Sequence, residues 1–154
     1  MTKVVIRKAK CSDAAQVINL SKKSIADDYG HFLTHESMSP WINGSKMDNY
    51  VKNMIPNMFV AEVNQQIIGV VAVDFAVVGL IWVDKEFRRR GVGSLLMKRA
   101  EEELVLGGFV LARVECFEEN AGGLFFYESC GWSIHNTRFD YDAGVNVVVL
   151  EKQL

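Results

Sequence analysis

The stretch FRRRGVGSLL, residues 87–96, joins three consecutive arginines to a Gly-Val-Gly turn and then to an apolar pattern typical of a helix. Residues 77–83, just upstream, form a run of β-branched and aromatic residues typical of a strand. A helix N-terminus is already the positive end of the helix dipole, so arginines there are unfavourable unless an anion is bound. Gly91 and Gly93 would let backbone N–H groups approach such an anion. The stretch therefore predicts a phosphate-binding turn between a strand and a helix.

Two common phosphate-binding motifs do not fit this turn. The dinucleotide-binding fingerprint needs a third glycine where this chain has Leu96. A P-loop needs Gly-Lys-Ser/Thr, which is absent from the stretch. Taken alone, the turn is compatible with an anion site or with a solvated basic loop.

Hydrophobic periodicity predicts the elements on either side of the turn. Strands are expected at 4–6, 59–63, 67–75, 77–83, 110–117, 132–141 and 145–150. Helices are expected at 14–25, 45–56, 91–106 and 120–129, and the stretch 29–44 between the first two helices is expected to be an irregular loop. The order βααβββαβαββ predicts an α/β (α+β) fold with a mixed, mostly antiparallel sheet flanked by helices. We expect residues 1–154 to form a single domain.

Composition excludes several classes of protein. The chain has 154 residues, of which 49 % are hydrophobic and 23 % charged, as in an ordinary globular domain. The net charge of −2 argues against a broad nucleic-acid-binding surface. Neither a leader pattern nor an apolar run long enough to span a membrane stands out, so a cytoplasmic location without a membrane partner is expected. Cys11, Cys116 and Cys130 lack CxxC spacing, and no metal site is expected from them or from His31 and His35.

A resemblance to a known family rests first on the turn itself. Arg88-x-x-Gly91-x-Gly93 resembles motif A of the GNAT superfamily of acyl-CoA N-acyltransferases, and the preceding IWVDKEFR, residues 81–88, is similar to the family's fourth strand and its exit. A second match lies downstream, where Asn120, Tyr127, Gly131 and Trp132 resemble motif B. Two motifs in the right order imply the GNAT fold over nearly the whole chain.

The resemblance implies acetyl-CoA as a cosubstrate bound along the strand and the turn. Its pantetheine arm would pair with the strand and its pyrophosphate would lie on the turn. The implied residues are Trp82, Val83, Arg88, Arg89, Gly91, Val92, Gly93 and Ser94. Asn120 would contact the pantetheine amides, although an Asn before a helix is also a routine N-cap.

The resemblance also implies the catalytic groups. Tyr127 matches the tyrosine that protonates the departing thiolate; a core aromatic is the alternative reading of that residue. Many members carry a carboxylate on the fourth strand, but residues 75–83 contain none. Asp74 is the nearest candidate base in the sequence, with a chain of waters, an amine of low pKa, or a plain turn aspartate as alternatives.

The acceptor is expected beside the stretch 29–44, where Tyr29, Phe32 and Trp41 would line its site. The leading hypothesis is an N-acetyltransferase that moves acetyl from acetyl-CoA to a primary amine of a small molecule, by direct attack in a ternary complex. Acetylation of a protein N-terminus or a lysine is the alternative within enzymes. A CoA-binding module without turnover is the alternative of another class. Two copies pairing through the C-terminal hairpin would form a homodimer.

Overall fold

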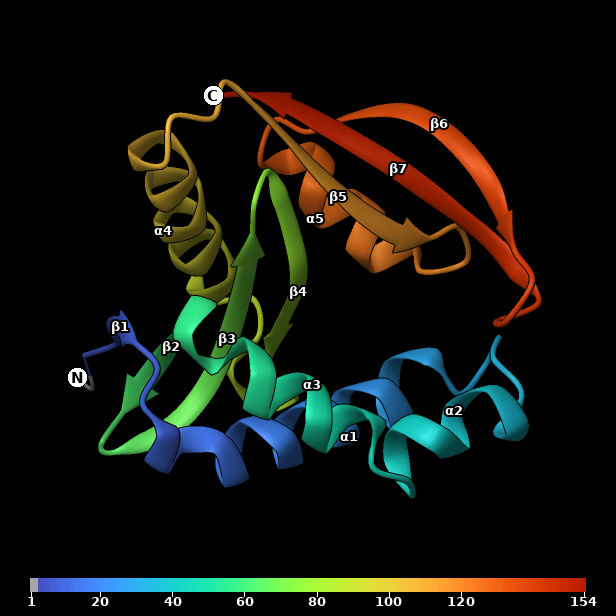
Figure 1. Cartoon of the computed structure of the whole chain (residues 1–154), viewed down its shortest axis with the longest axis horizontal. Helices are drawn as coiled ribbons and strands as arrows, with labels where there is room; N and C mark the ends of the chain where they lie inside the picture. Colours follow the sequence, from blue (N-terminus) through green and yellow to red (C-terminus); the bar gives the residue numbers. More distant parts are fainter. Residues whose placement is uncertain (1–2) are drawn as a thin grey trace.

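The computed structural model describes residues 3–154 (Figure 1). Within that range the strands are β1 (Val5–Lys8), β2 (Met58–Val63), β3 (Gln66–Asp74), β4 (Val77–Val83), β5 (Leu111–Phe117), β6 (Ser133–Asp140) and β7 (Val145–Gln153). The α-helices of the same range are α1 (Ala14–Tyr29), α2 (His35–Ile42), α3 (Lys46–Met54), α4 (Val92–Leu106) and α5 (Ala121–Ser129). The predicted α/β class, with helices flanking a mixed sheet, is confirmed.

Helix α2 is an addition to the predicted order, because it lies within the stretch 29–44 that was expected to be irregular. Thr34 caps it, since its hydroxyl oxygen accepts a hydrogen bond from the Ser37 N–H at 3.1 Å. Pro40 lies inside this helix, and none of the helix residues is fully buried. Its apolar face is the short set Met38, Trp41 and Ile42, which is partly buried against the cluster of α1 and α3, and Pro40 within that set is atypical of a helix interior, so the sequence pattern favours a loop.

The sheet has the strand order β1-β2-β3-β4-β5-β7-β6. Its neighbours are antiparallel except β4 and β5, which run parallel and pair only at Val77–Arg113 and Val78–Val114. Beyond those two pairs the strands separate, and Figure 1 shows β5 running away from β4. The separation leaves one backbone edge of β4 unpaired in the middle of the sheet.

A β-bulge marks the point where β4 and β5 separate. Ala72 pairs with Leu80 and Val73 with Val78, so Gly79 is the extra residue on β4. A Cβ at Gly79 would lie 2.7 Å from the Tyr50 hydroxyl, so helix α3 approaches the strand closely here. The bulge bends β4 and lets its second half diverge from β5.

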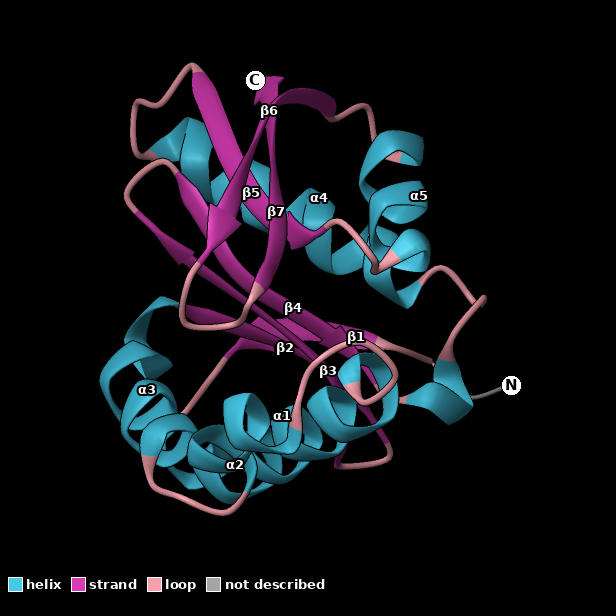
Figure 2. Ribbon diagram, turned by 90° about the vertical axis from the view of Figure 1, so that its right-hand side faces the viewer, coloured by secondary structure: helices cyan, strands magenta, loops and turns pink. Residues whose placement is uncertain are grey.

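Two hydrophobic clusters hold helices on both faces of β2 and β3. Phe59 and Ile68 pack with Leu96 of α4 on one face, whereas Val60 packs with Val17 of α1 on the other. Figure 2 shows α1, α2 and α3 on one side of strands β1–β4, with α4 and α5 on the opposite side. The separation of β4 from β5 therefore opens between two layers of helices.

Strand β6 of the C-terminal hairpin is an edge strand whose residues 133–139 are all exposed. The edge expected to pair in a homodimer is therefore accessible. Pairing of two copies there stays a prediction.

Candidate active site

The turn between β4 and α4 has the backbone geometry of an anion site. Gly91 precedes the helix with φ +80°, and nothing lies within 4 Å of the position that a Cβ would take. The first intrahelical bond runs from the Leu95 N–H to the Gly91 carbonyl, so the N–H groups of residues 92–94 have no acceptor inside the helix. Free N–H groups and the helix dipole together favour an anion at this point.

A cavity of about 630 Å³, here called the turn cavity, lies beside these N–H groups. All ten residues predicted to bind the cofactor line it: Trp82, Val83, Arg88, Arg89, Gly91, Val92, Gly93, Ser94, Asn120 and Tyr127. They come from β4, the turn, α4 and α5. The structure thus brings the two sequence motifs to a single cavity, although they are some thirty residues apart in the chain.

The three arginines of the turn differ in what they contact. The Arg88 guanidinium donates two hydrogen bonds to the carboxylate of Asp28 at the end of α1, at 2.9 and 2.8 Å, and its Nε donates to the Val83 carbonyl at 3.0 Å. Arg90 lies over the ring of Phe87, 5.4 Å from its centroid. Arg89 is exposed with φ +61°. Arg88 therefore ties the turn to α1, and Arg89 and Arg90 carry the charge that faces solvent.

The unpaired edge of β4 presents backbone groups to the gap. The Asp84 N–H donates to the Ile68 carbonyl of β3 at 2.7 Å. Backbone groups of successive residues in a strand point to alternate sides, so Trp82 also faces β3, whereas Ile81 and Val83 face the gap. The sequence prediction of Trp82 and Val83 is refined by this register, because the backbone groups available at the gap are those of Ile81 and the Val83 N–H.

Tyr127 lies on α5 with 8 % of its surface exposed and lines the turn cavity. Burial, with smaller contributions from Cys116 and Tyr29, raises the pKa of its phenol well above the usual value of 10. Asn120 caps the same helix, because its side-chain oxygen accepts from the Gly123 N–H at 3.1 Å. The phenol therefore stays protonated at neutral pH, and the capping alternative for Asn120 is what the structure shows.

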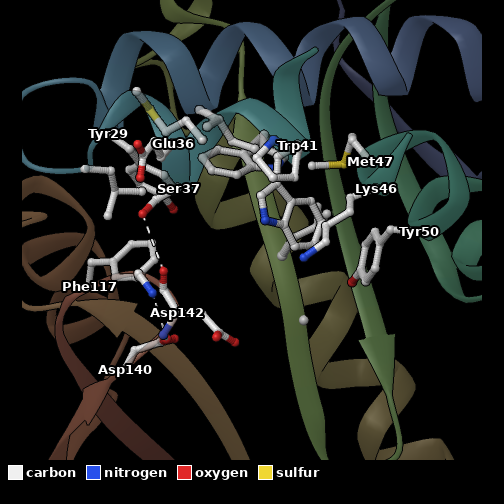
Figure 3. A pocket seen from close by; sticks show the side chains of 18 residues that line it. Tyr29, Glu36, Ser37, Trp41, Lys46, Met47, Tyr50, Phe117, Asp140 and Asp142 are labelled. Carbon is white, nitrogen blue, oxygen red and sulfur yellow. Dashed lines mark hydrogen bonds between the residues drawn. The ribbon is translucent and has the colours of Figure 1, made fainter. Parts of the chain in front are cut away.

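A second cavity of about 510 Å³, here called the aromatic cavity, lies on the α1–α3 side of β4 (Figure 3). Its aromatic lining consists of Tyr29, Trp41, Tyr50, Trp82 and Phe117. Of the residues predicted for the acceptor, Tyr29 and Trp41 line this cavity. Phe32 does not; its ring packs behind those of Tyr29 and Phe117, at centroid distances of 5.4 and 5.6 Å.

Charged side chains complete the aromatic cavity. Its carboxylates are those of Glu36 on α2 and of Asp140 and Asp142 at the tip of the β6–β7 hairpin, and Lys46 is its basic residue. Figure 3 shows Glu36 and Asp142 on the same side of the cavity, away from Tyr50. The hairpin tip is held there by the Ser37 hydroxyl, which donates to the Asp142 carbonyl at 3.4 Å. Sequence analysis missed these carboxylates, because the contact joins residues 105 positions apart.

Asp74, predicted as the base, is exposed at the end of β3 and lines neither cavity. The pKa of Tyr50, which lines the aromatic cavity, is raised mainly by burial and to a smaller extent by the charge of Asp74. The structure therefore does not bring Asp74 together with Tyr127. It relates Asp74 to the aromatic cavity only through the Tyr50 phenol.

The two cavities meet at Tyr29 and Trp82, which line both. The Tyr29 ring lies 5.4 Å from the ring of Trp82 on β4 and 5.1 Å from that of Phe117 on β5. It therefore fills the gap that opens between these strands. Burial raises the pKa of the Tyr29 phenol, which stays protonated as well.

Neither a metal site nor a membrane-spanning helix is found in residues 3–154. Over that range no three His, Cys, Asp or Glu side chains are grouped in a way that would hold a metal ion. Nor does any helix in the described part of the chain have the length and apolarity needed to cross a membrane.

Comparison with known proteins agrees with this geometry. Residues 55–134 of the 154 match the acetyltransferase (GNAT) domain. The chain therefore belongs to the GNAT family of acetyltransferases.

Individual relatives share the fold or part of the sequence. PaiA N-acetyltransferase from Thermoplasma acidophilum, solved in complex with coenzyme A, superposes with a TM-score of 0.84 at 18 % identity, covering 99 % of each chain. An N-acetyltransferase from Staphylococcus aureus Mu50 superposes with a TM-score of 0.74 at 16 % identity, covering 98 % of each chain. At such identities the likeness shows a common fold.

A curated relative is the [ribosomal protein bS18]-alanine N-acetyltransferase of Salmonella typhimurium strain LT2. It is 35 % identical over 71 residues, which are 46 % of this chain and 48 % of that protein. The similarity thus spans about half the length of the relative.

Proposed function

We propose that the chain is an N-acetyltransferase that holds acetyl-CoA in the turn cavity and a primary amine in the aromatic cavity, and transfers acetyl directly between them. One observation carries the proposal: the two cavities reach the gap between β4 and β5 from opposite sides and meet at Tyr29 and Trp82. An amine and a thioester bound on the two sides would meet at the unpaired edge of β4.

The fit of the turn cavity to a CoA-type cosubstrate rests on its backbone. The free N–H groups of residues 92–94, with Arg89 lining the same cavity, suit the two negative charges of a pyrophosphate. The unpaired backbone groups of Ile81 and the Val83 N–H suit the amides of a pantetheine arm, which would add to the sheet like a short strand. Coenzyme A is bound in the PaiA structure, which shares the fold.

The chain supplies two groups for the transfer itself. A backbone N–H at the gap, on Ile81 or Val83, would stabilise the negative charge on the carbonyl oxygen as the amine attacks. Tyr127 would donate its proton to the departing thiolate, which requires a positioned hydrogen bond because its pKa is raised. Cys116 is an unsuitable covalent carrier, since burial raises the pKa of its thiol to about 11. Direct attack is therefore favoured over an acyl-enzyme.

The incoming ammonium must lose a proton before it attacks. Glu36, Asp140 and Asp142 line the aromatic cavity, and their negative charge would attract the ammonium and receive its proton directly or through water. Asp74, the candidate from sequence, would act only through the Tyr50 phenol. We assign deprotonation to the carboxylates of the aromatic cavity.

The acceptor is proposed to be a primary amine of a small molecule, because α2 and the hairpin tip meet over the aromatic cavity through Ser37 and Asp142. Acetylation of a protein N-terminus is the second candidate, favoured by the similarity to an alanine N-acetyltransferase. A thiol-release assay with small amines and with peptides that begin with alanine separates the two. Preference for the peptides would replace the small-molecule acceptor.

Calorimetry with acetyl-CoA tests the proposal at the turn. Gly91→Asp would put a carboxylate against the pyrophosphate, and we expect at least a hundredfold loss of affinity. Gly108→Asp is a matched control, because Gly108 has φ +86° and open space around it but lies in the loop between α4 and β5. It adds the same charge and a similar backbone strain elsewhere. Absence of acetyl-CoA binding to the wild type would overturn the proposed function.

A further inference from the structure

The gap between β4 and β5 is filled by aromatic rings from three separate elements. Tyr29 at the end of α1 packs against Trp82 of β4 at 5.4 Å and against Phe117 of β5 at 5.1 Å between ring centroids. The ring of Phe32 packs against those of Tyr29 and Phe117. We call Tyr29, Trp82 and Phe117 the junction cluster. Phe117 stood out neither by motif nor by spacing in the sequence.

The junction cluster lies where an acyl group would have to lie. Tyr29 and Trp82 line both cavities, and Phe117 lines the aromatic cavity. If the thioester is bound from the turn cavity and the amine from the aromatic cavity, the carbonyl carbon lies between them. The part of the acyl group beyond that carbon then points at the cluster.

The cluster leaves little room for a longer chain. Centroid distances of 5.1 to 5.4 Å are those of aromatic rings in direct contact. Protein interiors are packed closely enough that one additional methylene is felt. On the other face of β5, the space is taken by Cys116, which is 6 % exposed, and by Tyr127, which is 8 % exposed. An additional methylene would therefore have to displace a ring of the cluster on one side, or the buried Cys116 and Tyr127 side chains on the other.

We propose that the junction cluster restricts the acyl donor to acetyl-CoA, with Phe117 as a specificity-determining residue. This inference rests on the proposed function, because it takes the thioester to lie at the gap. It adds selectivity for the length of the acyl chain, which the backbone recognition of a CoA moiety cannot supply, since the pyrophosphate and pantetheine are the same in every acyl-CoA.

The test compares acetyl-, propionyl- and butyryl-CoA in two measurements, calorimetric affinity and, with an acceptor amine, kcat/KM. A pocket that must accommodate one unwanted methylene discriminates by roughly 10- to 200-fold. For the wild type we expect butyryl-CoA to be at least tenfold worse than acetyl-CoA in both measurements. In Phe117→Ala the ratio should shift toward butyryl-CoA by at least tenfold, and Phe117→Leu should give a smaller shift if the alanine variant does not fold.

Phe75→Ala is the matched control, because this ring is 80 % exposed at the β3–β4 turn and lines neither cavity. Its acyl selectivity should equal that of the wild type. Equal use of butyryl- and acetyl-CoA by the wild type would overturn the inference, as would an unchanged ratio in both Phe117 variants. Those outcomes leave the proposed function intact, whereas failure of the wild type to bind any acyl-CoA would overturn both.

Discussion

The two cavities that meet at the junction cluster are built in different ways. The turn cavity takes its polar recognition from backbone groups on β4 and on the first turn of α4, which follow one another within residues 81–94. The aromatic cavity takes its recognition from side chains on α1, α2, α3, β4, β5 and the β6–β7 tip. The first is a product of local backbone conformation, and the second a product of distant packing. In the proposed function the first would hold the cosubstrate and the second the acceptor.

The arginine run illustrates the same difference within a few residues. Arg88 belongs to the turn motif, yet its guanidinium is held by Asp28, 60 positions earlier in the chain. That ion pair fixes the wall formed by the end of α1, which includes Tyr29, to the turn. The two cavities are therefore built separately but share a fixed boundary.

The largest effect is expected from a substitution that removes the proposed acid, Tyr127, from the turn cavity. Tyr127→Phe keeps the ring that packs on Trp132 and deletes only the hydroxyl. General acid catalysis contributes about 10²- to 10⁴-fold, so we expect kcat to fall by about a hundredfold or more with every acceptor. The affinity for acetyl-CoA should change little in calorimetry. Tyr141→Phe, at a residue 89 % exposed, is the control. Undiminished turnover in Tyr127→Phe would remove this phenol from the mechanism.

The pH dependence of wild-type activity distinguishes the proton loss expected in the aromatic cavity from the proton donation expected in the turn cavity. The acceptor must be deprotonated, so kcat/KM should rise by up to tenfold per pH unit until the pKa of the amine or its base is passed. Tyr127 must be protonated, and burial raises its pKa above 10, so its protonated form persists at all lower pH values. We therefore expect no alkaline decline below about pH 10. A decline between pH 8 and 9.5 would indicate a different acid.

The smallest expected effect belongs to the aromatic cavity alone. Trp41→Ala removes a large ring from its lining, and we expect the KM for the acceptor to rise by about tenfold, because one large apolar contact is lost. The Kd for acetyl-CoA should remain that of the wild type. Phe139→Ala, which truncates an aromatic residue 47 % exposed on β6, serves as the control. Weakened acetyl-CoA binding in Trp41→Ala would show that the cavities are not independent.

Much of the fold could be predicted from the sequence because its elements bury an apolar face. Strands β2 and β3 are buried on both faces and appear in the sequence as nearly continuous apolar runs, whereas helix α4 is buried along one stripe with helical spacing. Helix α2 has only eight residues, with Pro40 among the partly buried Met38, Trp41 and Ile42, so its short apolar pattern was difficult to distinguish from a loop. Only its Thr34 cap is a sequence signal, and that signal is short.

The site residues likewise fall into those that local sequence motifs predicted and those that depend on distant contacts. The residues of the turn cavity were found by two motifs, because the glycines and the helix start that shape it are neighbours in the chain. Phe117 and the hairpin aspartates were missed, because nothing in residues 111–117 or 140–142 indicates which helix they will face. The predicted base, Asp74, was chosen by closeness in sequence, and the register of β3 puts it outside both cavities.

The sequence by itself determined where a strand stops, where a glycine turn follows and where helix α4 starts, and with them a place for phosphate. Those features depend on backbone dihedral angles and on contacts within about four residues, which local sequence controls. Only the tertiary structure decided that Arg88 pairs with Asp28, that Tyr29 fills the gap between β4 and β5, and that the hairpin tip brings carboxylates over α2. These contacts join segments from 53 to 105 positions apart, and their geometry follows from the packing of the whole sheet and its helices rather than from any one stretch.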